Sequence, residues 1–410
     1  MNTGNRVLKN AFHLGYSRYI SQILRFIAFL IIAREISTED YGKYIIILAF
    51  VDIFTFLTLP GMNKPIIREG ARDIENLKSI LDSRVSIRNI MGIIAFISCN
   101  ICLFFTDYSP VLKQTIFIFS FSIIINVLIV YLRIVFRVHE VSQIIGYDYL
   151  IQSILFSLLS VTFVLNGYSY HALVYVLLST HIVSLAFNIF HSRKFVPINL
   201  FSKLNFDFNF LKSSMYFTLI NVFWLIISKI DLLMISFLDK AEEVAFYSVA
   251  NRMVGVGILG VSVVMKASYP ALVKKLKKGV FNYRQLGYYP YFYLFLVIFG
   301  SLALYFTFDL FIINFIGEKY SPSLEVLKVL IIYIFLQAFI SPMILLLQSN
   351  DLEKRIFYCL IPLPLLKIFL NLYFFPEYGI MGMAYSTVSI YSIFLVLIFI
   401  TNIDLFRKYV

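Results

Sequence analysis

The segment YSRYISQILRFIAFLIIA (residues 16–33) is apolar enough and long enough to cross a bilayer, yet it contains two arginines. Arg18 and Arg25 are seven residues apart, and Ser21 and Gln22 fall between them at helical spacing, so these side chains share one polar face of a helix. An arginine near the middle of a membrane helix costs roughly 2.5–3.5 kcal/mol on insertion scales, and such residues usually face water or a partner. The segment therefore predicts one wall of a solvated, positively charged chamber inside a helical membrane protein.

The composition of the whole chain is that of a polytopic membrane protein. Of its 410 residues 60% are hydrophobic and only 14% are charged, and the mean hydropathy is +0.84. A soluble domain carries about 25% charged residues, so little of the chain remains for one. The net charge of +12 would suggest nucleic acid as the partner of a soluble protein. Here the basic residues sit where membrane topology needs them, so the lipid bilayer is the expected partner and nucleic acid is not.

Apolar windows of about 20 residues predict twelve membrane-spanning helices and an all-α fold. The predicted spans are 13–33, 44–60, 87–106, 113–133, 147–165, 170–190, 213–236, 245–266, 288–308, 325–347, 356–375 and 380–402. A polar segment at 191–212 separates six spans from six, which predicts an N-terminal lobe at 1–190, a cytoplasmic linker at 191–212 and a C-terminal lobe at 213–410. Two six-helix repeats suit a transporter whose site lies between its halves.

The distribution of basic residues predicts which side of the membrane each loop faces. With an even number of spans both termini lie on one side, and 23 of the 35 lysines and arginines, Arg133 and Arg137 among them, fall in segments on that side. The loops on the other side are short and hold few basic residues: Arg34, Lys43, Lys113, Lys240 and Lys319. Because short basic loops stay in the cytoplasm, both termini are predicted to be cytoplasmic.

The ionisable residues inside the predicted spans are mostly basic. The carboxylates Asp52 and Asp231 stand against five cations, namely Arg18, Arg25, Lys229, Arg252 and Lys367. Internal salt bridges are one interpretation, but two such pairs would still leave at least three cations for an anionic ligand or a hydrated cavity. The planar guanidinium group suits bidentate binding of phosphate, so a phosphorylated substrate is the favoured interpretation.

Other polar residues within spans have simpler expected roles. Asp148 and Gln152 form a pair near the cytoplasmic end of the 147–165 span, where we expect Asp148 to be solvated. His181, Ser184 and Asn188 share one helix face, on which a hydrogen-bonded structural histidine is favoured over a proton carrier. In the 356–375 span, two prolines precede Lys367 and predict an interrupted helix beside a cavity.

Sequence motifs for catalysis are missing. No G-x-x-x-x-G-K-[ST] loop, H-E-x-x-H motif or other closely spaced set of metal ligands occurs, so neither an enzyme nor a metal site is expected. The run GVGILG at 255–260 has glycines at the spacing of a dinucleotide fingerprint. That motif needs a preceding strand and a helix start, which a membrane helix does not offer, so these glycines are expected to permit close packing instead.

Short patterns along nearly the whole chain resemble those of the polysaccharide or O-antigen flippase family. They are AREISTEDYGKY (33–44), LPGMNKPIIRE (59–69), SKIDLLMISFL (228–238), AEEVAFYSVANR (241–252), SPSLEVLKVL (321–330) and PEYGIMGMAYST (376–387). The family belongs to the superfamily that also holds multidrug exporters and lipid II flippases. The resemblance implies a MATE-like fold in the bacterial inner membrane, with two six-helix lobes around a central cationic cavity that opens alternately to either side.

The resemblance also implies a substrate and the residues that bind it. The substrate would be a polyprenyl-diphosphate-linked oligosaccharide, carried from the inner to the outer leaflet without a cofactor, and a polysaccharide polymerase and a chain-length regulator would be partners. Arg18, Arg25 and Arg252 occupy places where relatives have cavity arginines that matter for transport. Gln22 would join this substrate-binding set, and Lys229 and Lys367 would add to its positive field. Asp52 and Asp231 are candidates for coupling transport to Na⁺ or H⁺.

Two alternative functions follow from the same composition. An exporter of small cationic drugs in the same superfamily would need an acidic cavity, whereas the charges within the predicted spans are mostly positive. A membrane polysaccharide polymerase or ligase has similar length and hydrophobicity, but it would need catalytic basic residues in a large external loop. No predicted external loop is that large, so the flippase is the favoured reading.

Overall fold

The computed structural model describes residues 3–58, 60–195, 208–238, 240–258, 289–350 and 352–404. Within these ranges the regular secondary structure is helical and no β-strand is found. The chain divides into two compact units, residues 1–225 and 226–410. This division falls inside helix α8 (Phe208–Ser236), and the lobe boundaries derived from the sequence stay a prediction.

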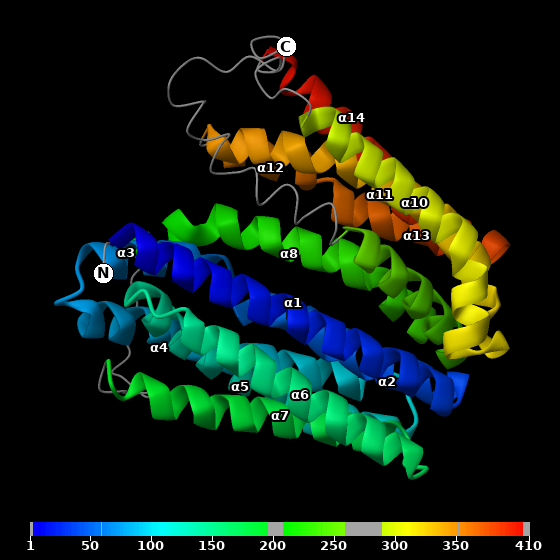
Figure 1. Cartoon of the computed structure of the whole chain (residues 1–410), viewed down its shortest axis with the longest axis horizontal. Helices are drawn as coiled ribbons and strands as arrows, with labels where there is room; N and C mark the ends of the chain where they lie inside the picture. The colour runs from blue at the N-terminus through cyan, green and yellow to red at the C-terminus, as the bar shows by residue number, and fades with distance from the viewer. Residues whose placement is uncertain are drawn as a thin grey trace. The chain divides into compact units, whose positions relative to one another are not determined.

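Unit 1 is a bundle of long helices that run side by side (Figure 1). Helix α1 packs mainly on α6, and α5 packs on both α4 and α7. Two short 3₁₀ turns and a ten-residue helix, α3, join α2 to α4. The helices of this unit, in chain order, are α1 (Thr3–Glu35), α2 (Thr38–Phe54), α3 (Asn63–Arg72), α4 (Leu77–Phe104), α5 (Pro110–Val138), α6 (Gln143–Leu165) and α7 (Tyr170–Ser192).

Local capping fixes where these helices begin. The hydroxyl of Ser37 accepts the backbone N–H of Asp40 at 3.1 Å and starts α2. The hydroxyl of Ser109 accepts the N–H of Leu112 at 3.4 Å, and Pro110 takes the first position of α5, where its missing N–H costs nothing. Short polar turns of this kind reverse the chain between neighbouring apolar helices and so set the order of the bundle.

Unit 2 contains the end of α8, a helix at residues 241–258 and the last five α-helices. Helix α14 packs on both α11 and α13. The predicted interruption is confirmed, because α12 ends at Leu360 and α13 begins at Leu363, with Pro362 between them. The remaining helices are α10 (Tyr289–Phe311), α11 (Pro322–Ser349), α12 (Glu353–Leu360), α13 (Leu363–Tyr378) and α14 (Ile380–Ile400).

Two glycines allow α14 to turn back tightly on α13. Gly379 has φ of +55°, a conformation that favours glycine. A Cβ atom on Gly382 would lie 2.5 Å from the carbonyl oxygen of Phe374, so only glycine permits this approach of the two backbones. The close packing places the inner face of α14 directly against α13.

Eleven helices among the described residues are long and apolar enough to cross a membrane. They correspond to eleven of the twelve predicted spans. The other predicted span, 245–266, begins inside the helix at 241–258, and its second part lies outside the described residues. The polytopic, all-α fold class is therefore confirmed.

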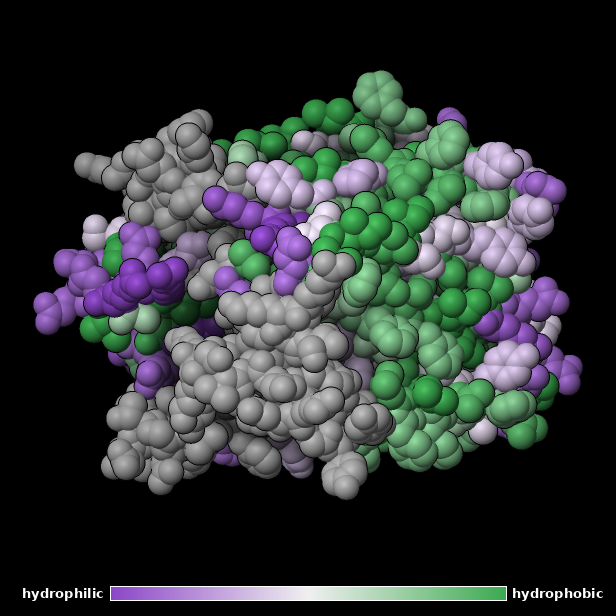
Figure 2. Space-filling view, turned by 90° about the horizontal axis from the view of Figure 1, so that it is seen from above, coloured by the Kyte–Doolittle hydropathy of each residue, from purple (hydrophilic) through white to green (hydrophobic). Residues whose placement is uncertain are grey.

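The surface of this bundle is rich in exposed large apolar side chains. On α10 alone Phe299 is 61% exposed, Phe306 71% and Leu310 65%. Figure 2 shows one face on which hydrophobic residues cover much of the described surface, with hydrophilic residues gathered toward its edges. A soluble monomer rarely exposes apolar patches of this extent, whereas a lipid-facing surface does.

Candidate functional site

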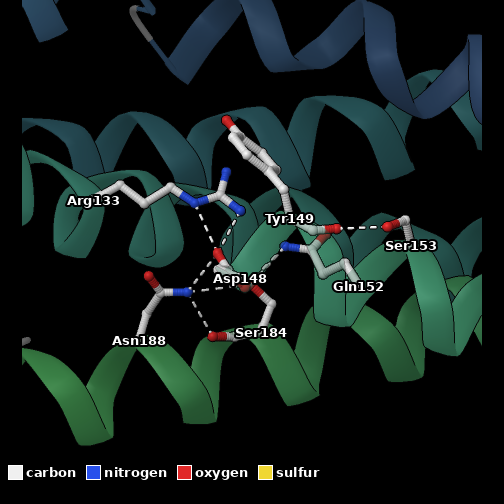
Figure 3. Close-up of polar contacts among 7 residues, drawn as sticks. All are labelled: Arg133, Asp148, Tyr149, Gln152, Ser153, Ser184 and Asn188. Carbon is white, nitrogen blue, oxygen red and sulfur yellow. Dashed lines mark hydrogen bonds and ion pairs between the residues drawn. The ribbon is translucent and has the colours of Figure 1, made fainter. Parts of the chain in front are cut away.

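Asp148 is the centre of a buried polar network in unit 1. Its side chain is fully buried and accepts hydrogen bonds from side chains on three helices (Figure 3). Arg133 of α5 donates Nε and Nη2 to Oδ2, at 2.9 and 2.6 Å. Asn188 of α7 donates to the same oxygen at 2.8 Å, while Ser184 and Gln152 donate to Oδ1 at 2.7 and 3.2 Å. The carboxylate thus joins α5, α6 and α7 at one end of the unit.

This geometry corrects the expectation that Asp148 is solvated. Asp148 lies in the second turn of α6, close to the helix end, but α5 and α7 cover it completely. A buried carboxylate is tolerated only when it is paired and hydrogen-bonded, and the Arg133 ion pair with three further donors meets that need. Ser184 and Asn188 belong to the same network, while His181, one turn away on α7, packs on the Phe119 ring.

The two arginines of α1 lie over aromatic rings of α6. The guanidinium carbon of Arg18 is 5.7 Å from the centre of the Tyr149 ring, and that of Arg25 is 5.9 Å from the centre of the Phe156 ring. Both distances lie within the range of cation–π attraction. The seven-residue spacing on α1 is matched by the same spacing on α6, so the two helices run in parallel register here.

Small side chains hold α1 close to α6. A Cβ atom on Gly146 would meet the Ser17 hydroxyl at 2.9 Å and the His13 carbonyl oxygen at 3.3 Å. Just over two turns beyond Tyr149, the hydroxyl of Ser157 donates to the backbone carbonyl of Leu24 at 3.1 Å. These contacts fix the register that brings each arginine of α1 over its ring.

Arg133 of α5 meets Arg18 at the same ring, and Arg137 of α5 interacts electrostatically with both. The guanidinium carbon of Arg133 is 4.5 Å from the centre of the Tyr149 ring. Arg137, one turn further along α5, interacts electrostatically with Arg18, Arg133 and Tyr149. Arg18 and Arg137 are exposed, and neither has an ion-pair partner among the described residues. From the sequence, Arg133 and Arg137 are expected only to set the membrane topology, and nothing in it predicts their cluster with Arg18.

Asp231 is the centre of a second buried network, in unit 2. Lys367 of α13 donates Nζ to Oδ1 at 2.8 Å, and Asn371, one turn later, donates to the same oxygen at 2.8 Å. Tyr247 and Thr387 donate their hydroxyl groups to Oδ2 at 2.6 and 2.9 Å. The network therefore ties α8 to the 241–258 helix, α13 and α14.

The ammonium group of Lys367 is enclosed by oxygen atoms. Besides Asp231, it donates to the Thr387 hydroxyl at 2.6 Å and points to the Met383 carbonyl oxygen at 3.5 Å. The Lys367 side chain is 0% exposed and the Asp231 side chain only 5%. This is an internal ion pair of the kind left open by the sequence. In this conformation a cation reaches Asp231 only after the lysine leaves.

The other predicted site residues are less deeply buried. Arg25, Gln22, Lys229 and Asp52 are partly exposed, and Arg252 on the 241–258 helix is exposed. Their substrate-binding or ion-coupling roles stay predictions. The described residues hold no group of three or more histidine, cysteine, aspartate or glutamate side chains arranged to bind a metal ion.

Solved structures with the same fold are transporters and flippases. The lipid II flippase MurJ, in an inward closed conformation, is similar with a TM-score of 0.72 and 18% identity over 95% of this chain and 87% of that one. An inward-facing multidrug resistance MATE transporter of the MOP superfamily gives 0.67 and 15% identity, with 94% of each chain covered. A MOP superfamily transporter from Pyrococcus furiosus gives 0.61 and 16%, over 98% and 95%.

The helical bundle thus has the same fold as these MATE and MurJ structures. No curated protein matches the sequence. The family is nevertheless clear, because the profile described as "Polysaccharide biosynthesis protein" matches residues 7–275. The chain belongs to this polysaccharide biosynthesis protein family, which confirms the resemblance drawn from the short sequence patterns.

Proposed function

We propose that this protein is a flippase for a polyprenyl-diphosphate-linked oligosaccharide, such as an O-antigen repeat unit. It carries the unit from the inner to the outer leaflet of the cytoplasmic membrane, with both of its own termini in the cytoplasm. The two lobes alternate in access, so the charged head passes through a polar, positively charged interior while the prenyl chain stays in lipid. Transfer of an intact glycolipid requires no bond to break, and the protein acts as a transporter rather than an enzyme.

The observation that carries this proposal is the state of the arginines on α1. Arg18 lies within a membrane-spanning helix, is exposed, and has no carboxylate partner among the described residues. Such a charge is expensive in a membrane unless it faces water or an anion. The cation–π contact with Tyr149 holds Arg18 over the ring without neutralising its charge. The match to the polysaccharide biosynthesis family and the fold shared with a lipid II flippase support a phosphorylated glycolipid as this anion.

A reconstituted flipping assay tests the proposal. Proteoliposomes carry the purified protein and a polyprenyl-diphosphate-linked oligosaccharide whose terminal sugar an impermeant oxidase labels from outside. We expect the wild-type protein to expose the inner-leaflet pool to the oxidase with time. Arg25→Ala should slow this exposure by about 10- to 100-fold, because charged hydrogen bonds contribute about 1.5–3 kcal/mol each. Arg25→Lys keeps the charge and loses the planar fork, so an intermediate rate is expected.

Arg34→Ala is the matched control, since it removes the same group from the last turn of the same helix. Full activity in both Arg25 variants would remove the charge-binding idea. Failure of the wild-type protein to expose the glycolipid would reject the flippase assignment. Transport of a cationic dye by the same proteoliposomes would instead favour the drug exporter, and lengthening of the oligosaccharide would favour the polymerase.

A further inference from the structure

We propose that Arg18, Arg133 and Arg137 form a phosphate-binding site at the cytoplasmic end of unit 1, where the diphosphate of the lipid substrate first docks. The inference rests on the proposed function for the identity of the ligand. It adds two arginines of α5 to the predicted binding residues. It also separates the docking position from the level of Arg25, which is seven residues or about 10 Å further along α1.

Convergence on one ring is the first argument. The guanidinium carbons of Arg133 and Arg18 lie 4.5 and 5.7 Å from the centre of the Tyr149 ring. Arg137 interacts electrostatically with all three residues. Figure 3 shows the Arg133 guanidinium and the Tyr149 ring side by side above the carboxylate of Asp148. The guanidinium groups of Arg18 and Arg133, from two helices, thus lie over one aromatic ring that does not neutralise them, and Arg137 is within electrostatic range of both.

The local charge balance is the second argument. Among the described residues, the carboxylate that contacts this cluster is that of Asp148, and it accepts hydrogen bonds from Arg133, Ser184 and Asn188. It neutralises Arg133 and fixes that side chain, so Asp148 acts as a positioning residue. Within the part of the chain that the structure describes, Arg18 and Arg137 then remain as an excess of two positive charges. Like charges at close range destabilise a fold by themselves, and a bound anion removes that repulsion.

Accessibility is the third argument. Arg18 and Arg137 are exposed, and the Arg133 side chain is 14% exposed although its carboxylate partner is fully buried. Arg133 uses Nε and Nη2 on Asp148, and no described contact takes its Nη1. A phosphate oxygen can therefore accept from a pre-fixed guanidinium while two more arginines close on it. Guanidinium groups suit this role because several N–H donors lie in one plane.

The substrate-docking site is tested by binding of a short prenyl diphosphate to the purified protein in neutral detergent. Farnesyl diphosphate is the probe, and farnesol is the probe without phosphate. We expect farnesyl diphosphate to bind and farnesol not to bind measurably. Arg137→Ala should raise the Kd of farnesyl diphosphate about tenfold, as expected for one charge-assisted contact, and Arg137→Lys should raise it less. Arg193→Ala, an exposed arginine at the end of α7, should leave the Kd unchanged.

Several results would overturn the inference. One is an unchanged Kd in Arg137→Ala, with melting temperature showing that the variant is folded. Another is equal binding of farnesol and farnesyl diphosphate. Displacement of the probe by a small excess of phosphatidylglycerol would assign the site to a resident phospholipid instead of the substrate. A different result would reject the proposed function alone. In that case the wild-type protein binds farnesyl diphosphate through Arg137 but does not flip the glycolipid.

Discussion

Replacing Lys367 by methionine should destabilise unit 2 far more than an ordinary lysine substitution does. Methionine keeps the length and apolar stem of the side chain but removes the ammonium group that is 2.8 Å from Asp231 Oδ1. The aspartate then stays in a site where its side chain is only 5% exposed, with three neutral donors and no counter-charge. Removing one partner of a buried ion pair costs about 3–5 kcal/mol, which we expect for Lys367→Met.

The reverse substitution and the double variant show whether the cost comes from the pair. Asp231→Asn leaves a buried ammonium with the Thr387 hydroxyl and a carbonyl at 3.5 Å, so a loss of similar size is expected. The double variant buries no charge. Because uncharged replacements of buried pairs are often near neutral, it should be more stable than either single variant.

Unfolding in detergent is followed with a thiol-reactive dye. Cys99 and Cys359 are buried and react only on unfolding, while Cys102 is exposed and sets the baseline. The control is Lys240→Met, which breaks the exposed Lys240–Glu243 pair of the same unit and should cost about 1 kcal/mol or less. If the losses in Lys367→Met and Asp231→Asn simply add in the double variant, the two charges are not coupled and the reasoning is refuted.

Three further outcomes follow from the buried networks and the packing. Asp148→Leu should lower the melting temperature by an amount equivalent to about 3–5 kcal/mol, because it strands a guanidinium among unpaired donors; a loss below about 1 kcal/mol would show that the carboxylate is solvated. Gly382→Ala should cost about 1–3 kcal/mol through its clash with the Phe374 carbonyl, whereas Gly300→Ala, with open space around it, should be neutral or stabilising; equal effects would contradict the packing. Exchanging K⁺ for Na⁺ should shift the melting temperatures of wild type and Asp231→Asn equally, since an ammonium already neutralises this carboxylate; a Na⁺-dependent rise confined to wild type would show that the ion displaces the lysine.

The helices and their membrane character follow from local sequence, so they were predictable. Long apolar runs must form helices in lipid because only internal hydrogen bonds satisfy the backbone there. The interruption at Pro362 follows equally from a local property, the missing N–H. The polar stripe of Arg18 and Arg25 also required only helical periodicity. The aromatic rings that these arginines contact could not be predicted in this way, because Tyr149 and Phe156 lie on another helix about 130 residues further along the chain.

The partners of the buried charges were not predictable for the same reason. Asp148 lies near a helix end, and the sequence shows only the Gln152 contact one turn away. The partners that bury it are 15, 36 and 40 residues distant on other helices. Asp231 and Lys367 are further apart still, so counting charges within spans left internal ion pairs open without showing that these two residues form one. A hint was present in Lys367 and Asn371, since four-residue spacing places both on one face of α13.

The buried networks of Asp148 and Asp231 have the same composition but leave the basic side chain in different environments. In each unit a buried aspartate meets a basic side chain, an asparagine and hydroxyl donors, which ties neighbouring helices together. The lysine of unit 2 is fully enclosed, so its charge is cancelled where it lies. The arginine of unit 1 keeps one edge outside the pair, where Arg18 and Arg137 add two uncancelled charges. A guanidinium permits this because it binds the carboxylate with one side and still offers donors on another, which an ammonium enclosed by oxygens does not. The proposed anion site of unit 1 therefore uses an arginine, whereas the network that holds the helices of unit 2 together uses a lysine.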